Sequence, residues 1–302
     1  MPRNVLTLQA STIEGWWDRA VESVARGLEI LRDDCGVLTP GWLPYRPIVM
    51  PFAAINAKMA RPGSLTTGAI RQKLVRWFWC AVFGQTYDQG SNSQAAEDVG
   101  ELLAWCAGGE PPESVSGFRF DPEVLRDVTS RQSALYRGAM CLVMSRGPRD
   151  FHSGAKLTGD LMAERHIDAH HIFPQTYLQR HGVAARLSNC VLNCTLIDRT
   201  TNQSLYTRAP ADYLAQICTT LGDQHFRELL ESHLLPSEPD SPLWRNDFEE
   251  FLARRQELLW QEIQRVTGLA HTPSRTEDQA RPPLRIRGGR IWTPLVSVHE
   301  GV

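Results

Sequence analysis

Apolar residues recur every three or four positions through most of the first 145 residues, which is the spacing of one face of an α-helix. The first such segment, residues 11–36, begins with a Ser11-x-x-Glu14 capping box and ends at Gly36. Four of its apolar residues share one face and are predicted to be buried: Val21, Val24, Leu28 and Leu31. Further helices are predicted over residues 51–60, 69–84, 95–109 and 130–147, and the aromatic run 77–79 is predicted to be core.

The pattern changes between Asp150 and about Asp198, where β-branched and apolar residues stand at short spacing between turn residues. Two short strands are predicted there, within 164–173 and 187–198, and helical character returns after Asn202. A long amphipathic helix is predicted over 247–268. Its candidates for burial are Phe248, Phe251, Leu252, Leu258 and Leu259.

Composition excludes several classes of protein. The 302-residue chain is 42% hydrophobic and 22% charged, which is ordinary for a folded globular protein. Its net charge of −2 does not by itself indicate a nucleic-acid-binding protein. The seven cysteines are scattered, and no apolar run reaches the ~18 residues that a membrane span needs. Because the first residues also lack a signal-peptide pattern, we expect a cytoplasmic protein with reduced cysteines and no membrane segment.

Polar residues of related chemistry cluster around the two predicted strands. Asp168, His170 and His171 belong to the first, Asn193 to the second, and Asn202 to the start of the following helix. Neutral imidazole and carboxylate groups bind divalent transition metals, whereas carboxylate, amide and water oxygens suit magnesium. These residues alone leave two alternatives open, a metal or catalytic site and a histidine-rich surface turn.

The spacing and the surrounding sequence resemble the HNH nucleases, the His-Me finger or ββα-metal superfamily. The similar segments IDAHHIFPQTYL, LNCTLIDRTTNQSLYTRAPADYL, ESHLLP and NDFEEFLARRQELL together resemble the C-terminal half of bacterial modification-dependent and anti-phage defence endonucleases. Those enzymes join a ParB-like nucleotide-hydrolysing domain to an HNH domain, and WLPYRPIVMPFAAI and LVRWFWCAVFGQTY are similar to their helical linker. The resemblance covers roughly residues 11–266 and is most specific over 167–214. It implies a mainly α protein with a small ββα-metal (HNH) nuclease finger inserted between helical segments.

The resemblance also implies catalytic roles for three residues. His171 would be the general base that takes a proton from the attacking water, a task suited to an imidazole near neutral pH. Asn193 would fix the loop between the strands and so orient His171. Asp168 would complete the metal shell or orient an imidazole.

Metal and substrate contacts follow from the same resemblance. His170 and Asn202 would bind a single divalent cation. Because Asn202 stands where many HNH enzymes have histidine, its harder amide oxygen favours Mg²⁺ or Mn²⁺ over Zn²⁺ or Ni²⁺. Arg199 and Arg208 would contact the phosphates of the substrate.

The implied function is hydrolysis of DNA phosphodiester bonds in bacterial anti-phage defence or restriction. The alternatives are a non-cleaving nucleic-acid-binding or docking subunit of a defence complex, and an RNA-directed HNH toxin. The sequence holds no Asp-Gly-x-Gln-Arg stretch of the ParB-like domain. Three alternatives stay open: the nucleotide-hydrolysing sensor is a separate subunit, the chain is part of a longer protein, or the protein is a family member controlled in another way.

Four segments are predicted: an N-terminal helical domain (1–147), the HNH core (148–215), C-terminal helices that pack on the core (216–268) and a loosely ordered Arg/Pro/Gly tail (269–302). The pair Cys190-x-x-x-Cys194 could suggest zinc, but no second pair follows it. We therefore predict two buried thiols beside Asn193.

Overall fold

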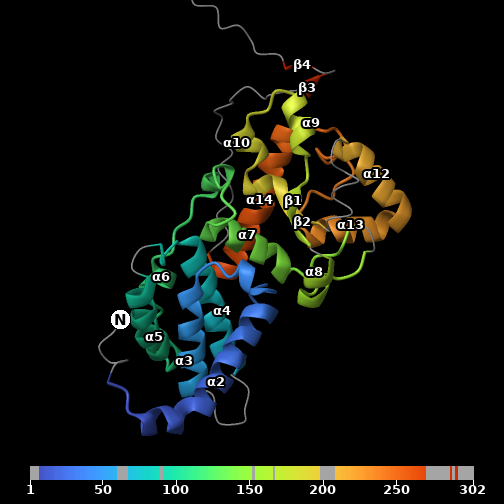
Figure 1. Ribbon diagram of the computed structural model, residues 1–302. Helices are drawn as coiled ribbons and strands as arrows, with labels where there is room; N and C mark the ends of the chain where they lie inside the picture. Colours follow the sequence, from blue (N-terminus) through green and yellow to red (C-terminus); the bar gives the residue numbers. More distant parts are fainter. Residues whose placement is uncertain are drawn as a thin grey trace, which may run out of the picture. The chain divides into compact units, whose positions relative to one another are not determined.

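The computed structural model describes residues 7–59, 67–88, 91–151, 154–165, 167–197, 208–269, 286–287 and 290–291, and these residues are mainly helical (Figure 1). The α-helices are α2 (Ala10–Asp33), α3 (Val49–Met59), α4 (Gly68–Phe83), α5 (Ser91–Cys106), α6 (Glu113–Ser116), α7 (Ala134–Ser145), α8 (Gly159–Arg165), α9 (Gln175–Arg180), α10 (Ala185–Ser188), α12 (Pro210–Leu221), α13 (Asp223–Ser232) and α14 (Phe248–Thr267). The strands are β1 (Asp168–His171), β2 (Cys194–Ile197), β3 (Ile286–Arg287) and β4 (Arg290–Ile291). Short 3₁₀ turns are η1 (Pro40–Trp42), η2 (Arg46–Ile48), η3 (Pro122–Arg126) and η4 (Val191–Asn193). The predicted combination of a mainly helical chain and a small sheet is confirmed.

The described residues form two compact units. The first contains those up to Asp121, together with Arg131–Ser145 and Ile263–Leu269. The second contains Pro122–Ser130 and Arg146–Glu262. The first unit is built from helices, and the second carries the β1–β2 pair.

In the first unit, α3 lies between α2 and α5, and α4 packs on α7 (Figure 1). The predicted aromatic core is confirmed, since the three side chains of the run 77–79 are fully buried in α4. Phe78 meets Trp79 edge to face with 4.9 Å between ring centroids, the arrangement that the aromatic quadrupole favours. On α2, Gly27 allows close approach to α3, because a Cβ there would lie 3.1 Å from the Cβ of Phe52.

The start of α2 and its buried face differ from the sequence prediction. The N-cap is Gln9, which makes no side-chain capping bond, so Ser11 lies inside the helix and the predicted capping box is wrong. The buried residues of α2 are Ser23, Gly27, Ile30 and Leu31. The predicted burial is correct for Leu31 alone, while Val21, Val24 and Leu28 are 52%, 38% and 47% exposed. The cause is steric: α3 packs on the side of α2 where Gly27 permits close contact, and that leaves the neighbouring apolar stripe uncovered.

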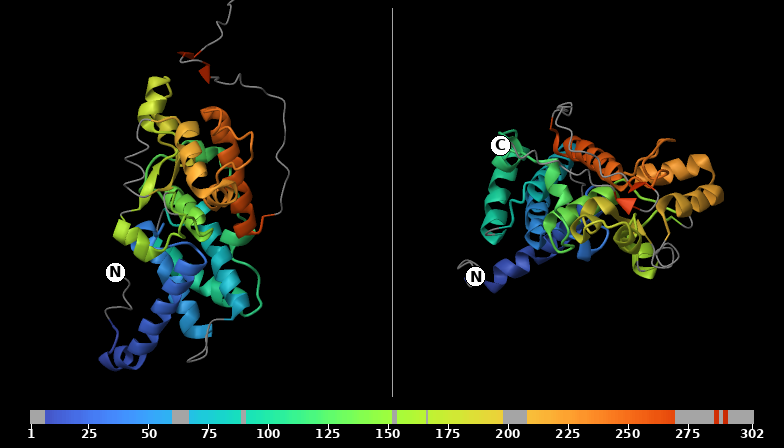
Figure 2. Two further views of the ribbon diagram at one scale, coloured as in Figure 1. Left: turned by 90° about the vertical axis from the view of Figure 1, so that its right-hand side faces the viewer. Right: turned by 90° about the horizontal axis from the view of Figure 1, so that it is seen from above.

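In the second unit, β1 and β2 form an antiparallel pair, with His170 opposite Thr195 and His171 opposite Cys194. Residues 172–193, which include α9 and α10, connect the two strands. Figure 2 gives two further views of this region and of α12–α14. The predicted long helix is confirmed as α14. Of its predicted core residues, Phe248, Phe251, Leu252 and Leu259 are buried and Leu258 is half-buried.

Among the described residues, no helix combines the length and the apolar character needed to cross a membrane.

Candidate functional site

The two predicted site histidines lie at the end of β1 and are both half-buried. Since successive strand residues point to opposite faces, His170 shares a face with Thr195 and His171 shares the other with Cys194. One imidazole is therefore presented on each face of the ribbon.

Asn193 is fully buried and fixes the loop that leaves β1. Its Oδ1 accepts from the backbone N–H of Phe173 at 2.8 Å, and its Nδ2 donates to the carbonyls of Phe173 at 3.0 Å and Ser188 at 2.9 Å. Its own carbonyl accepts from the N–H of Ile172 at 2.8 Å. Every polar atom of the amide thus has a backbone partner, and the chain just after His171 has little freedom to move.

The His171 ring is oriented by Asn189, which follows α10. His171 Nε2 lies 3.2 Å from Asn189 Oδ1. The amide orientation is fixed independently, because Asn189 Nδ2 donates to the carbonyl of Ala185 at 2.9 Å and Gln175 Nε2 donates to Asn189 Oδ1. An amide oxygen can only accept, so His171 Nε2 is the donor in this contact.

The opposite face of the ribbon rests on a buried histidine. Thr195 Oγ1 lies 2.7 Å from His233 Nδ1, and His233 Nε2 donates to the carbonyl of Arg149 at 2.6 Å. Because Nε2 donates, Nδ1 accepts the Thr195 hydroxyl proton and the imidazole is neutral. Burial lowers the pKa of His233 from 6.5 to about 4, and this outweighs the opposing effect of the Arg149 carbonyl.

A fully buried guanidinium lies beside this histidine. Arg255 of α14 donates to the carbonyls of His233, of Leu234 at 2.5 Å and of Cys194 at 3.4 Å. Burial lowers the pKa of Arg255 to about 9, so the group remains a cation at neutral pH. The carbonyl of Cys194 connects this cation directly to the strand residue that faces His171.

Helix α12 is attached to the same loop. The Tyr213 hydroxyl donates to the carbonyl of Ile172 at 2.8 Å, and Tyr213 is buried. Arg208, just before α12, donates to Gln216 Oε1 at 2.7 Å and to the carbonyl of Asp212 at 3.2 Å. The predicted phosphate-contacting guanidinium is therefore ordered at the start of α12.

The structure brings His170, His171 and Asn193 together around one strand end. Of the other predicted residues, Asp168 is placed by its backbone in β1 opposite Ile197, while Asn202 and Arg199 lie outside the described residues. Within the part of the chain that is described, no group of three or more His, Cys, Asp or Glu side chains could bind a metal ion.

The cysteines beside Asn193 are buried free thiols, as predicted. Cys194 Sγ lies 3.6 Å from the carbonyl of Cys190, and burial raises the pKa of Cys190 to about 11. A thiol in this state is a poor nucleophile and a poor metal ligand.

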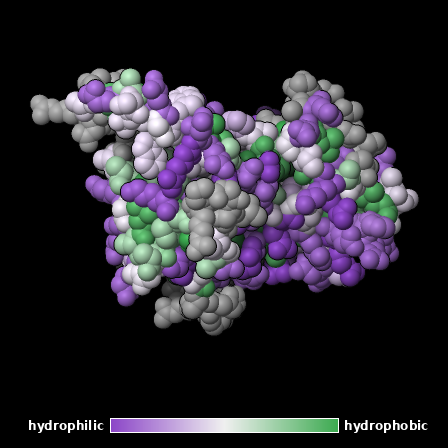
Figure 3. All heavy atoms as spheres, turned by 90° about the horizontal axis from the view of Figure 1, so that it is seen from below, coloured by the Kyte–Doolittle hydropathy of each residue, from purple (hydrophilic) through white to green (hydrophobic). Residues whose placement is uncertain are grey.

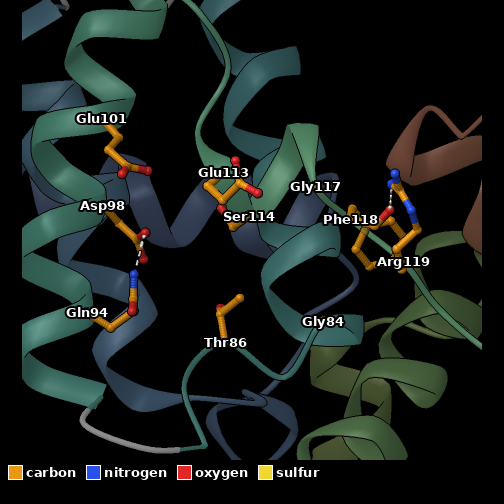
Figure 4. Close-up of a pocket in the computed structure, with 10 residues that line it drawn as sticks. All are labelled: Gly84, Thr86, Gln94, Asp98, Glu101, Glu113, Ser114, Gly117, Phe118 and Arg119. Atoms are coloured by element: carbon orange, nitrogen blue, oxygen red, sulfur yellow. Dashed lines mark hydrogen bonds between the residues drawn. The ribbon is translucent and has the colours of Figure 1, made fainter.

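A separate cavity of about 490 Å³ lies in the first unit. Figure 4 shows Gln94, Asp98 and Glu101 along α5, facing Glu113 of α6 across it. Asp98 is buried and accepts from Gln94 Nε2 at 3.2 Å, and burial raises its pKa. The three carboxylates make this cavity unsuited to a phosphate group.

Sequence reasoning missed three residues that build the site: Asn189, His233 and Arg255. The segment 185–190 carries a polar Asn189 at the end of a short helix, but a pattern search has no means to pair it with His171. His233 stands alone in the sequence, and the structure shows it as a core histidine with both ring nitrogens hydrogen-bonded. For Arg255, the available signal was its place on the apolar stripe of the predicted helix, one turn after Phe251.

The chain is 24% identical over 247 residues to an uncharacterized protein of Methanocaldococcus jannaschii. The match covers 74% of this chain and 40% of the archaeal protein, so the chain spans well under half of that relative's length. No family model matches the chain, and no solved structure matches it. These comparisons assign neither a family nor an activity.

Proposed function

We propose that the protein is a metal-dependent HNH-type endonuclease that hydrolyses DNA phosphodiester bonds, in bacterial anti-phage defence or restriction. The observation that carries the proposal is the orientation of His171, whose ring is held through Nε2 by an amide that is itself fixed. A general base must be held in one direction toward the water that it deprotonates, and with Nε2 as the donor, Nδ1 would be the nitrogen that accepts the proton. The surface-turn alternative does not account for a histidine held by such a network.

The chain's own residues divide the work of water attack. His171 Nδ1 would accept a proton from the water that attacks phosphorus. The Asn193 bonds to Phe173 and Ser188 keep the loop in one conformation, and Asn189 keeps the imidazole plane fixed. Preorganisation of this kind lowers the barrier because no reorientation is needed at the moment of reaction.

The donor set would pair one imidazole nitrogen, which transition metals such as Mn²⁺ accept, with one amide oxygen, which suits a hard cation. His170 provides one half-exposed imidazole, and Asn202 would provide an amide oxygen. Mg²⁺ keeps several waters and binds through few protein groups, so two protein ligands are consistent with Mg²⁺ or Mn²⁺. When bound, the cation would neutralise the charge that develops on the phosphate oxygens.

The test is cleavage of plasmid DNA with Mg²⁺ or Mn²⁺ by wild type, His171→Ala and His225→Ala. His225 is exposed on α13, so its variant is a matched histidine control and should cut normally. We expect His171→Ala to lose at least about 100-fold in rate, the usual contribution of a general base. Asn189→Ala should lose about 10–100-fold in kcat with little change in KM, because it acts through His171.

Equal cleavage by wild type and His171→Ala would exclude His171 as the base. Duplex binding that survives chelation, with no cleavage in any metal, would instead support a non-cleaving subunit. Selective cutting of RNA in a substrate panel would support an RNA-directed toxin.

A further inference from the structure

Helix α2 carries a continuous apolar stripe that no described residue covers. The two tryptophans are the most prominent members, with Trp16 54% and Trp17 62% exposed. The large apolar residues exposed on this helix are Ile13, Trp16, Trp17, Val21, Val24 and Leu28. At 100° per residue all except Trp16 fall within one narrow face, and Trp16 lies at its edge, with the Arg19 guanidinium 5.0 Å from its ring.

The size of the stripe is that of an interface rather than of scattered surface residues. With about 150–250 Å² for a whole aromatic side chain and somewhat less for an aliphatic one, the exposed fractions of these six residues amount to roughly 550 Å². This area lies at the upper end of the range of about 300–600 Å² for the largest apolar patch of a typical monomer. It matches the apolar part of a standard interface, which buries about 800 Å² on each partner and is somewhat more than half apolar. Figure 3 shows hydrophobic side chains at several places on a mainly hydrophilic face of the molecule.

We propose that α2 binds α2 of a second copy of this chain, antiparallel, about a two-fold axis between Ala20 and Val21. In this register Ile13 faces Leu28 of the partner subunit, and Trp17 faces Val24 of the partner subunit. The largest side chain, Trp17, thus meets the small Val24 of the partner subunit, while Ile13 and Leu28 are equal in size, so the stripe is complementary to itself. A two-fold interface requires this property, because the same surface is used twice.

Charges at the edge of the stripe fit the antiparallel direction. Glu14 and Arg32 lie along the same edge of α2, one near each end of the helix. Antiparallel pairing places Glu14 on the same side of the interface as Arg32 of the partner subunit; within its own chain the Arg32 guanidinium lies 2.8 Å from Asp33. The opposite, charged face of the helix carries Glu22 and Arg26, which form an ion pair with each other at 2.7 Å.

The test is the molar mass of the full chain by sedimentation equilibrium over a wide range of concentration. Wild type should approach twice the 34.0 kDa chain mass, while Val21→Glu and Val21→Lys should each remain monomeric. An equimolar mixture of the two variants should recover the dimer, because opposite charges then meet at the axis. Gly15→Glu is the matched control: a Cβ there meets nothing within 4 Å, it lies on the opposite face, and it should leave the dimer intact.

A second pair of variants avoids added charge. On mild oxidation Ala20→Cys should form an interchain disulfide, and Gly15→Cys should not. A monomeric wild type at every concentration would overturn the proposal, and would leave the stripe to a different protein. A dimer that persists in both Val21 variants, or a mixture that stays monomeric, would also overturn it.

Discussion

Mild acid should destabilise the protein through His233, which is neutral and fully buried. Burial lowers its pKa from 6.5 to about 4; Arg255 acts in the same direction, while the Arg149 carbonyl and Asp150 act against it. In the unfolded chain the imidazole returns to a pKa of about 6.5. Below that pH the unfolded state takes up a proton that the folded state does not. The free energy of unfolding therefore falls as the pH drops from about 6.5 to about 4.

The size of the effect follows from the difference between the two pKa values. One pKa unit corresponds to about 1.4 kcal/mol, so the complete transition removes about 3 kcal/mol. About 2 kcal/mol of this should be lost between about pH 8 and about pH 5. Solvent screening does not reduce this free energy, because the His233 side chain is 0% exposed.

The assay is urea unfolding of wild type and His233→Gln at a series of pH values. A glutamine can donate to the Arg149 carbonyl and accept from Thr195, as the imidazole does, but it does not titrate. Over the same pH interval the variant should lose about 2 kcal/mol less than wild type, and the comparison cancels the other titrating groups. Parallel pH profiles for the two proteins would refute the buried neutral histidine.

Two further predictions concern backbone geometry. Asn193→Ala removes three hydrogen bonds to the loop after β1 and leaves buried backbone groups of Phe173 and Ser188 without partners. The free energy of unfolding measured in urea should therefore fall by about 3 kcal/mol or more. A fall of less than about 1 kcal/mol would contradict this. Gly36 has a φ of +68°, and a Cβ there would clash with the backbone carbonyl of Cys141, so Gly36→Ala should lower the thermal midpoint. The control is Gly15→Ala, because a Cβ at this position within α2 meets nothing, and it should raise the free energy of unfolding by about 0.5–1 kcal/mol. If Gly36→Ala and Gly15→Ala changed the stability in the same direction, the steric explanation would be wrong.

Which parts of the fold were predictable depends on how many partners an element has. The aromatic run of α4 and the apolar stripe of α14 are surrounded on their apolar sides, and there the sequence identified the buried residues correctly except for the half-buried Leu258. On α2 the periodicity was equally clear but identified the wrong face, because two apolar faces adjoin and α3 covers only one. Periodicity reports that a face is apolar. Whether the chain itself covers that face depends on steric detail such as Gly27, and on partners outside the chain.

The site shows the same division between local and long-range information. The strand that carries His170 and His171 can be predicted locally, but its support comes from Asn189, His233 and Arg255, and these are adjacent only in the folded chain. Arg255 also changes how the net charge of −2 bears on the proposed function. A cation fully buried against the Cys194 carbonyl is screened far less than a surface charge, so it favours an anion at the neighbouring strand end. In the proposed function, this cation would attract a phosphodiester locally although the protein as a whole is slightly acidic.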